Sequence, residues 1–396
     1  MVGKEKLNKD TTMNFKNINR YLLTLLGLCM LSTIMSCSDW TDVDNKEYHI
    51  SDIQNQNPKL YAKYLESLKA YKNEDHKVIY AWFDNSEKKP HHRSQHITNV
   101  PDSVDVIILE YPKNLADWEL TEMDEVRTNK GTKVIYSIKL ESIKADYLEV
   151  TENLAEEKAQ LIANATAEAN KKLEDAIAAG QTDATLDDFL DLDAINSEFP
   201  DIDFKEFLTE SLQELIKLDL EFNYDGINIG YLGKGTTHLF PNEKKEYEET
   251  EAIFIGLIKG WIERNSNKWI VFEGKPQNLI DKSFLESCKH IMIPTAHAVN
   301  PSALLYEINT AIVDGVPTDR FVVTAQIPSN DPNNATLGFW TDNTPAVTST
   351  ATWATGSFAF DVSGLGILNI NQDYFSTPSI YTLSRSAIGI LNPSLK

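Results

Sequence analysis

The stretch NYDGINIGYL, residues 223–232, decides how the rest of the chain is interpreted. Ile227, Ile229 and Tyr231 alternate with smaller or polar residues, and successive side chains of a β-strand point to opposite faces. The stretch therefore predicts a buried strand that presents Asn228 and its neighbours toward its end. Whether that end carries chemistry depends on the elements around it.

Seven further apolar runs of the chain have the length of a strand. They are rich in Val, Ile, Phe and Tyr, as expected for strands that are buried on both faces. Helical or loop stretches separate them, which favours an α/β fold with a parallel sheet, and eight such strands close a (β/α)8 TIM barrel. An open doubly wound sheet is the alternative, but no glycine-rich phosphate turn follows the first run. The eight expected strands are residues 77–83, 104–112, 132–140, 224–232, 268–274, 290–298, 320–328 and 356–364.

The chain is longer than a minimal barrel, which takes about 250 residues. The surplus lies in residues 150–210, where an Ala/Glu/Lys-rich segment predicts a long helix and an acidic linker follows. The linker lacks the glycine and terminal glutamate of an EF-hand loop, so calcium is not expected there. We therefore expect a barrel domain over residues 57–396 with a helical insertion between its third and fourth strands. Further helices are expected over residues 57–72 and 242–265.

The charge and composition of the chain exclude several partners. With 396 residues and a formal net charge of −22, the protein lacks the overall basic character that nucleic acid requires, and adsorption to anionic lipid is disfavoured for the same reason. Its three cysteines and eight histidines form neither a disulfide framework nor a ligand pattern such as HxxxH. We therefore expect no metal ion and no cofactor.

Residues 1–36 are expected to be a leader rather than part of the fold. A basic start precedes the apolar run YLLTLLGLCMLSTIM, which is short for a membrane span and typical of a secretory signal. The end of this run, IMSC at residues 34–37, resembles a bacterial lipobox, which implies cleavage before Cys37 and lipidation of that residue. An ordinary signal with an incidental cysteine is the alternative. Residues 37–56 are expected to be an acidic tether, similar to that of surface-exposed lipoproteins of Bacteroidota, which implies an outer-membrane, cell-surface location.

Functional side chains of a TIM barrel lie at the carboxyl ends of its strands and in the loops that follow. In this chain those positions combine aromatic residues with carboxylates and amides. Aromatic faces stack on the apolar faces of sugar rings, while polar groups bond to hydroxyls, so such a cleft fits carbohydrate. The residues that we expect to line it are Trp82, Tyr111, Tyr231, Glu273, Gln326, Trp340 and Trp353.

The fourth expected strand resembles the signature D-G-x-D-x-D-x-E of glycoside hydrolase family 18, which contains chitinases and endo-β-N-acetylglucosaminidases. Asp225 and Gly226 match its opening pair. Asn228, Gly230 and Leu232 stand where the family has its three further carboxylates. In that family the terminal Glu protonates the glycosidic oxygen, and the Asp two residues earlier holds the N-acetyl group that attacks the anomeric carbon. The resemblance therefore implies the barrel and its cleft, but not the ordinary turnover of the family.

Three functional hypotheses follow. The first is a non-catalytic lipoprotein that holds an N-acetylglucosamine-containing oligosaccharide, such as an N-glycan, at the cell surface beside an outer-membrane glycan transporter. The second is an active endo-acting glycosidase whose acid comes from another strand, with Glu110, Glu273 and Asp361 as candidates. The third is an adhesin that uses the barrel only as a scaffold. Asp225 has a purely structural alternative, as the partner of a cation.

Overall fold

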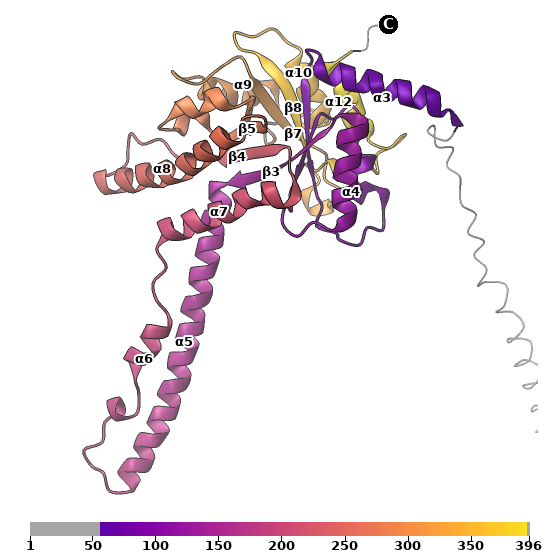
Figure 1. Ribbon diagram of the computed structural model, residues 1–396. Coiled ribbons are helices and arrows are strands. Elements are labelled where there is room, and N and C mark those ends of the chain that lie inside the picture. Colours follow the sequence, from indigo (N-terminus) through magenta and orange to yellow (C-terminus); the bar gives the residue numbers. More distant parts are fainter. Residues whose placement is uncertain (1–55, 394–396) are drawn as a thin grey trace, which may run out of the picture. The chain divides into compact units, whose positions relative to one another are not determined.

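The computed structural model describes residues 56–393 and contains a closed barrel of eight parallel strands (Figure 1). Each strand pairs with the next along the chain, and the last pairs with the first. The chain divides into two units, residues 1–63 and 64–396, and the barrel lies entirely within the second. The expected TIM barrel is thus confirmed, and the open doubly wound sheet is excluded. The strands are β1 (Val78–Phe83), β2 (Val106–Leu109), β3 (Lys133–Lys139), β4 (Gly226–Tyr231), β5 (Trp269–Gly274), β6 (His290–Ile293), β7 (Phe321–Gln326) and β8 (Val362–Leu368).

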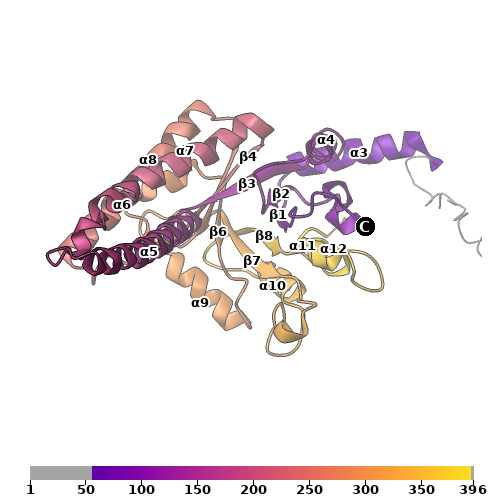
Figure 2. The same ribbon diagram turned by 90° about the horizontal axis from the view of Figure 1, so that it is seen from below.

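Helices connect most of these strands on the outside of the barrel (Figure 2). Short 3-10 turns replace a helix after β1 and after β5, including η6 (Lys282–Ser287). The expected helices at residues 57–72 and 242–265 correspond to α3 and α8. The helices are α3 (Pro58–Asn73), α4 (Asp117–Glu125), α5 (Leu140–Ala178), α6 (Leu192–Glu198), α7 (Phe204–Phe222), α8 (Pro241–Arg264), α9 (Pro301–Ala311), α10 (Ala346–Ala354), α11 (Ile370–Asp373) and α12 (Thr382–Leu391).

The strands separate two apolar cores, because alternate side chains point into the barrel and out toward the helices. The outer core is the larger and takes Ile227, Ile229 and Tyr231 from β4. The inner core is a small cluster at the centre of the barrel, made of Tyr80, Trp82, Val106, Ile108, Ile135, Val271, Met292 and Val322. This alternation turns Asn228, the residue between the two isoleucines, into the barrel.

The expected helical insertion between the third and fourth strands is confirmed. Helix α5 begins directly after β3 and has 39 residues, which at the rise of an α-helix corresponds to roughly 60 Å. Figure 1 shows it running outward from the end of β3, with α6 alongside its distal half. Leu140, Ile143 and Ala169 are its buried residues, so most of its length is not part of the barrel core.

The expected eighth strand lies too early in the sequence. Residues 356–361 form no strand, and β8 begins at Val362, so Asp361 precedes the strand instead of ending it. The apolar residues of this run, Phe358 and Phe360, stack on each other with centroids 5.0 Å apart in the outer core. Asp361 therefore lies at the amino-terminal end of the barrel, and the hypothesis that it supplies a relocated acid is wrong.

Candidate functional site

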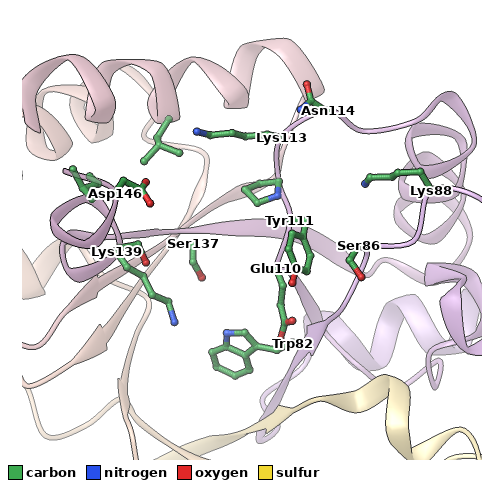
Figure 3. Close-up of a pocket in the computed structure, with 14 residues that line it drawn as sticks. Trp82, Ser86, Lys88, Glu110, Tyr111, Lys113, Asn114, Ser137, Lys139 and Asp146 are labelled. Carbon is green, nitrogen blue, oxygen red and sulfur yellow. The ribbon is translucent and has the colours of Figure 1, made fainter. Parts of the chain in front are cut away.

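A cavity of about 800 Å³ opens at the carboxyl ends of β1, β2 and β3 (Figure 3). Both its size and its mixture of apolar and polar walls suit an organic ligand. Its position is the one that a TIM barrel uses for function. The lining residues are Trp82, Ser86, Lys88, Glu110, Tyr111, Pro112, Lys113, Asn114, Ser137, Lys139, Ser142, Ile143, Asp146 and Leu215.

Two aromatic side chains, Trp82 and Tyr111, line the cavity, as the sequence predicts. The ring of Trp82 lies where a β-carbon on Gly366 would be only 2.7 Å away, so the absence of a side chain in β8 makes room for the indole. Tyr111 is 51% exposed, and its backbone N–H donates to the Asn85 side-chain oxygen, 2.9 Å away. One ring therefore lies at the floor, and the other stands exposed beside it.

A lysine side chain lies over Gly230, the position that the resemblance aligns with a family carboxylate. Lys139, Gly230 and Glu273 are direct neighbours across β3, β4 and β5. The Lys139 ammonium and the Glu273 carboxylate form an ion pair 3.0 Å long above the glycine. A β-carbon at Gly230 would lie 2.4 Å from Cγ and 2.9 Å from Cβ of Lys139. The lysine side chain thus fills the space in which an aspartate at position 230 would stand.

Asn228 lies in the row below this ion pair and is completely buried. Its amide donates to the Ser137 hydroxyl, 3.0 Å away, and to the second carboxylate oxygen of Glu273. Its carbonyl oxygen has no hydrogen-bond partner among the described residues. Glu273 is consequently held by a lysine and an amide, and it contacts lining residues without itself lining the cavity.

Glu110 is a carboxyl group of the cavity with a perturbed proton affinity. Burial in the cavity raises its pKa, the neighbouring Asp84 carboxylate raises it further, and the Lys139 ammonium acts in the opposite direction. A carboxyl group of this kind holds its proton to higher pH than an ordinary glutamate. Figure 3 shows Glu110 next to Trp82, with Lys139 across the cavity.

Leu232, which the resemblance aligns with the terminal Glu of the signature, lies at the rim of the barrel. Its side chain is 42% exposed, so no loop covers it. The Glu141 carboxylate accepts its backbone N–H at 2.9 Å, and the Asn278 amide donates to its carbonyl oxygen at 2.8 Å. The segment after β4 is therefore fixed by a side chain from the first turn of α5 and by one from the 3-10 turn after β5, while the leucine offers no proton.

The opening pair of the signature lies at the opposite end of the barrel and is structural. Asp225 accepts from Arg127 Nε and from the backbone N–H of Val134, both at 2.7 Å. A β-carbon at Gly226 would lie 1.8 Å from the carbonyl oxygen of Trp269, so this position accepts only glycine. The structural alternative for Asp225 is therefore confirmed.

The remaining predicted lining residues lie elsewhere. Tyr231 points outward and donates to the carboxylate of Glu251, a buried residue of α8, so it is not available to a ligand in the cavity. Trp340 is buried in the outer core, and Trp353 packs against the same core with its ring centroid 4.4 Å from that of Phe358. Gln326 ends β7 but does not border the cavity. An aromatic residue in a loop carries no sequence signal that tells whether the loop folds over it.

Several lining residues could not be predicted from the ends of the strands, because they lie in a helix or further along a loop. Ser142 and Asp146 belong to the first turns of α5, which face the cavity because the helix follows β3 without a loop. Lys88 reaches the wall from the loop after β1, where both oxygens of Glu119 lie 2.9 Å from its ammonium.

Within residues 56–393 there is no group of acidic, histidine or cysteine side chains that would hold a metal ion. The same residues contain no helix long and apolar enough to cross a membrane.

Comparisons with known proteins agree with this barrel. Among solved structures, a selenomethionine form of BT1044 with a Glu-to-Gln substitution is 16% identical, with a TM-score of 0.52 over 86% of this chain and 95% of that one. The endo-β-N-acetylglucosaminidase of Cordyceps militaris is 14% identical, with a TM-score of 0.50 over 83% of this chain and 95% of that one. No curated protein matches the chain. The family description "Glycoside hydrolase family 18, BT1044-like" matches residues 41–187 and 187–390, and the protein therefore belongs to glycoside hydrolase family 18.

Proposed function

We propose that the protein binds an N-acetylglucosamine-containing oligosaccharide, such as an N-glycan, without cleaving it. The observation that carries this proposal is the replacement of two acids on β4: Leu232 has no proton to donate, and Lys139 fills the space above Gly230. A general acid contributes about 10²–10⁴ in rate. With the acid absent and the neighbouring carboxylate position filled, the mechanism of the family has neither its proton donor nor its orienting group.

The cavity itself supports retention of a ligand. Trp82 and Tyr111 offer ring faces on which a sugar can stack, and Glu110, Lys139 and Asn114 offer polar groups for its hydroxyl and amide substituents. Tyr111 gives the sharper test because its exposed ring contributes little to the core.

The lipobox-like segment at residues 34–37 supports a proposal about where in the cell the protein binds glycan. We infer that Cys37 is lipidated and that the protein sits on the outer membrane at the cell surface, where a glycan-binding barrel would hold oligosaccharide for an adjacent outer-membrane transporter. Cys37 lies outside the described residues.

Binding and cleavage are separable by experiment. Isothermal titration with a chitobiose-core N-glycan should give saturable binding, and Tyr111→Ala should weaken it about tenfold through loss of a stacking face. Tyr306→Ala, on the 68% exposed tyrosine of α9, is the matched control and should bind as the parent does. Mass spectrometry of an N-glycoprotein incubated with the protein should detect no released oligosaccharide. Absence of glycan binding by the parent protein would leave the scaffold-only adhesin instead.

A second candidate function, hydrolysis with a relocated acid, is favoured by one observation: the raised pKa of Glu110 inside the cavity. A general acid works best when it keeps its proton near the operating pH. Oligosaccharide release that disappears in Glu110→Gln or Glu273→Gln, while binding persists, would replace the binding proposal with this one.

A further inference from the structure

A second cavity, of about 320 Å³, lies at the opposite end of the barrel. Strand starts surround it, among them Val78, Val106 and Lys133, together with the carboxyl-terminal half of α3. Because the candidate glycan site lies at the strand ends, this cavity is separate from it. Its lining consists of Lys69, Lys72, Asn73, His76, Val78, Asp105, Val106, Arg127, Gly131, Thr132, Lys133, Asp225 and Trp269.

The two carboxylates of this cavity are already engaged. Asp225 pairs with Arg127 at 2.7 Å. Asp105 lies 3.0 Å from His76 Nε2 and also accepts the backbone N–H of Ile79. The three lysines of the lining therefore remain without a carboxylate partner among the described residues, in a chain whose formal net charge is −22. The local charge is the reverse of the charge of the whole protein.

Lys72 is the most confined of these lysines. Its ammonium donates to the Val104 carbonyl oxygen and to the Thr132 hydroxyl, both at 2.6 Å, which leaves one N–H unused. Burial lowers the pKa of Lys72 to about 8, and the nearby Lys130 also lowers it, whereas Asp105 and Asp102 raise it. A buried ammonium without a carboxylate contact is costly unless a counter-charge approaches it.

Lys133 adds a second available cation. Its ammonium lies 5.4 Å from the centroid of the Trp269 ring, and that of Lys289 lies 5.2 Å from the same centroid. Both are cation–π contacts, in which the ammonium faces the ring, so neither of them is a hydrogen bond from an N–H group to an acceptor oxygen. Lys69 contributes a third ammonium, with a bond to the Thr128 carbonyl oxygen at 3.3 Å.

We propose that this basal cavity binds a tetrahedral oxyanion of the phosphate or sulfate class, held by Lys72 and Lys133. An oxyanion supplies several acceptor oxygens to the ammonium groups that line one cavity and offsets their positive charge. The same phosphate chemistry comes either from a free anion or from the headgroup of an anionic lipid, and the experiment below distinguishes them. The inference does not depend on the proposed glycan function.

The test uses the full mature chain and inorganic phosphate as the probe. Phosphate at constant ionic strength, balanced with chloride, should raise the melting temperature in a saturable manner. The Lys72→Met/Lys133→Met double variant should bind phosphate at least tenfold more weakly, about the loss expected for a charge-assisted hydrogen bond. Lys245→Gln, on the exposed face of α8, removes a charge elsewhere and should retain the shift. Far-ultraviolet circular dichroism of the double variant confirms that it is folded.

Sedimentation with phosphatidylcholine vesicles, with and without phosphatidylglycerol, identifies the source of the anion. Retention on the anionic vesicles that Lys72→Met/Lys133→Met abolishes assigns the site to a lipid headgroup. A phosphate-dependent shift without vesicle retention assigns it to a free anion. Equal effects of phosphate and chloride on the parent protein, or an unchanged phosphate response in the folded double variant, would overturn the proposal.

Discussion

At the scale of single residues, the most informative position is Gly230. The sequence alone predicts that a family carboxylate is missing there, because the alternation along the strand fixes which residues face inward. It does not predict that Lys139 fills the vacated space, because that contact joins residues on different strands and depends on the register between them. The missing carboxylate can be predicted from the motif, whereas the contact between Lys139 and Gly230 is known only from the structure.

This packing predicts a specific cost for a small substitution. Gly230→Ala should lower the free energy of unfolding by about 1–3 kcal/mol, since the new methyl group would meet Cβ and Cγ of Lys139 and not merely the flexible end of its side chain. Urea denaturation at pH 7 measures the change.

A double-mutant cycle isolates the clash. In a Lys139→Ala background, Gly230→Ala should cost far less, because the obstructing side chain is gone. The same cost in both backgrounds would show that the backbone of β4, rather than Lys139, excludes the methyl group.

A second prediction concerns His290, at the start of β6 in the floor of the barrel. Burial lowers its pKa to about 4, with Lys289 and Arg320 acting in the same direction, and its Nδ1 lies 2.7 Å from the Tyr80 hydroxyl. The imidazole of His290 takes up a proton near pH 6.5 in the unfolded chain, but only near pH 4 in the folded chain. Stability should therefore fall as the pH drops through this window, by up to about 3 kcal/mol from this residue.

Urea denaturation at pH 7 and pH 5 tests the assignment. His290→Gln should lose less stability than the parent over this interval, while His297→Gln, at a side chain that is 68% exposed, should behave as the parent does. His76 acts in the opposite sense: the hydrogen bond to Asp105 raises its pKa, so its contribution is present below pH 6.5 and fades as the pH rises. A parental slope in His290→Gln would contradict the assignment.

At the scale of elements, the corner that leads into β4 joins this strand to β3 and to the turn before β3. Asp225 ties the start of β4 to Val134 in β3 and to Arg127 in η3 (Val126–Lys130). Asp225→Ala should therefore destabilise the barrel by about 1–3 kcal/mol, since it leaves the backbone N–H of Val134 and the Nε–H of Arg127 without their acceptor. Thermal and urea unfolding measure this loss.

Asp319→Ala is the matched control, because its pair with Arg320 is largely exposed and such pairs contribute about 0–1 kcal/mol. Glycan binding by folded Asp225→Ala should equal that of the parent, since the corner lies at the end of the barrel away from the cavity. A selective loss of binding without a loss of stability would assign Asp225 to the site instead.

The elements were predictable to different degrees for physical reasons. Seven strands were recognised because long apolar runs of branched and aromatic residues mark strands that are buried on both faces. The eighth was misplaced because β8 contains Gly364 and Gly366, which weaken its apolar pattern, while the preceding aromatic run packs on the outside of the barrel. In the site, Trp82 and Tyr111 were predicted correctly because each lies at the end of a strand or just after it, with its side chain on the side of the cavity. Tyr231 was not, because it points to the opposite face of its strand.

At the scale of the whole molecule, the proposed location at the outer membrane leads to a prediction about Cys37. Cys37→Ser should remove lipidation and move the protein from the membrane fraction to the soluble fraction, because the acyl chains provide the anchor. Incorporation of labelled palmitate and cell fractionation measure the two effects.

Cys29→Ser is the matched control, since that cysteine lies within the apolar run of the leader and should leave the anchor unchanged. Membrane retention of Cys37→Ser would show that the leader ends differently from a lipobox. Protease treatment of intact cells then reports whether the barrel lies outside the outer membrane.

Under the proposed function, the ion pair above Gly230 also limits how the protein could acquire hydrolysis by the mechanism of the family. A substitution that placed a carboxylate at position 230 would meet the side chain of Lys139 before it could help any reaction. Removing Lys139 first would leave Glu273 without its cation, with no gain in catalysis to favour that step. Hydrolysis by the mechanism of the family would therefore require changes on two strands, together with an acid at position 232, and none of the three has a benefit alone. If the protein only binds its glycan, as proposed, Lys139 makes substitutions that alter binding specificity more accessible than substitutions that produce cleavage.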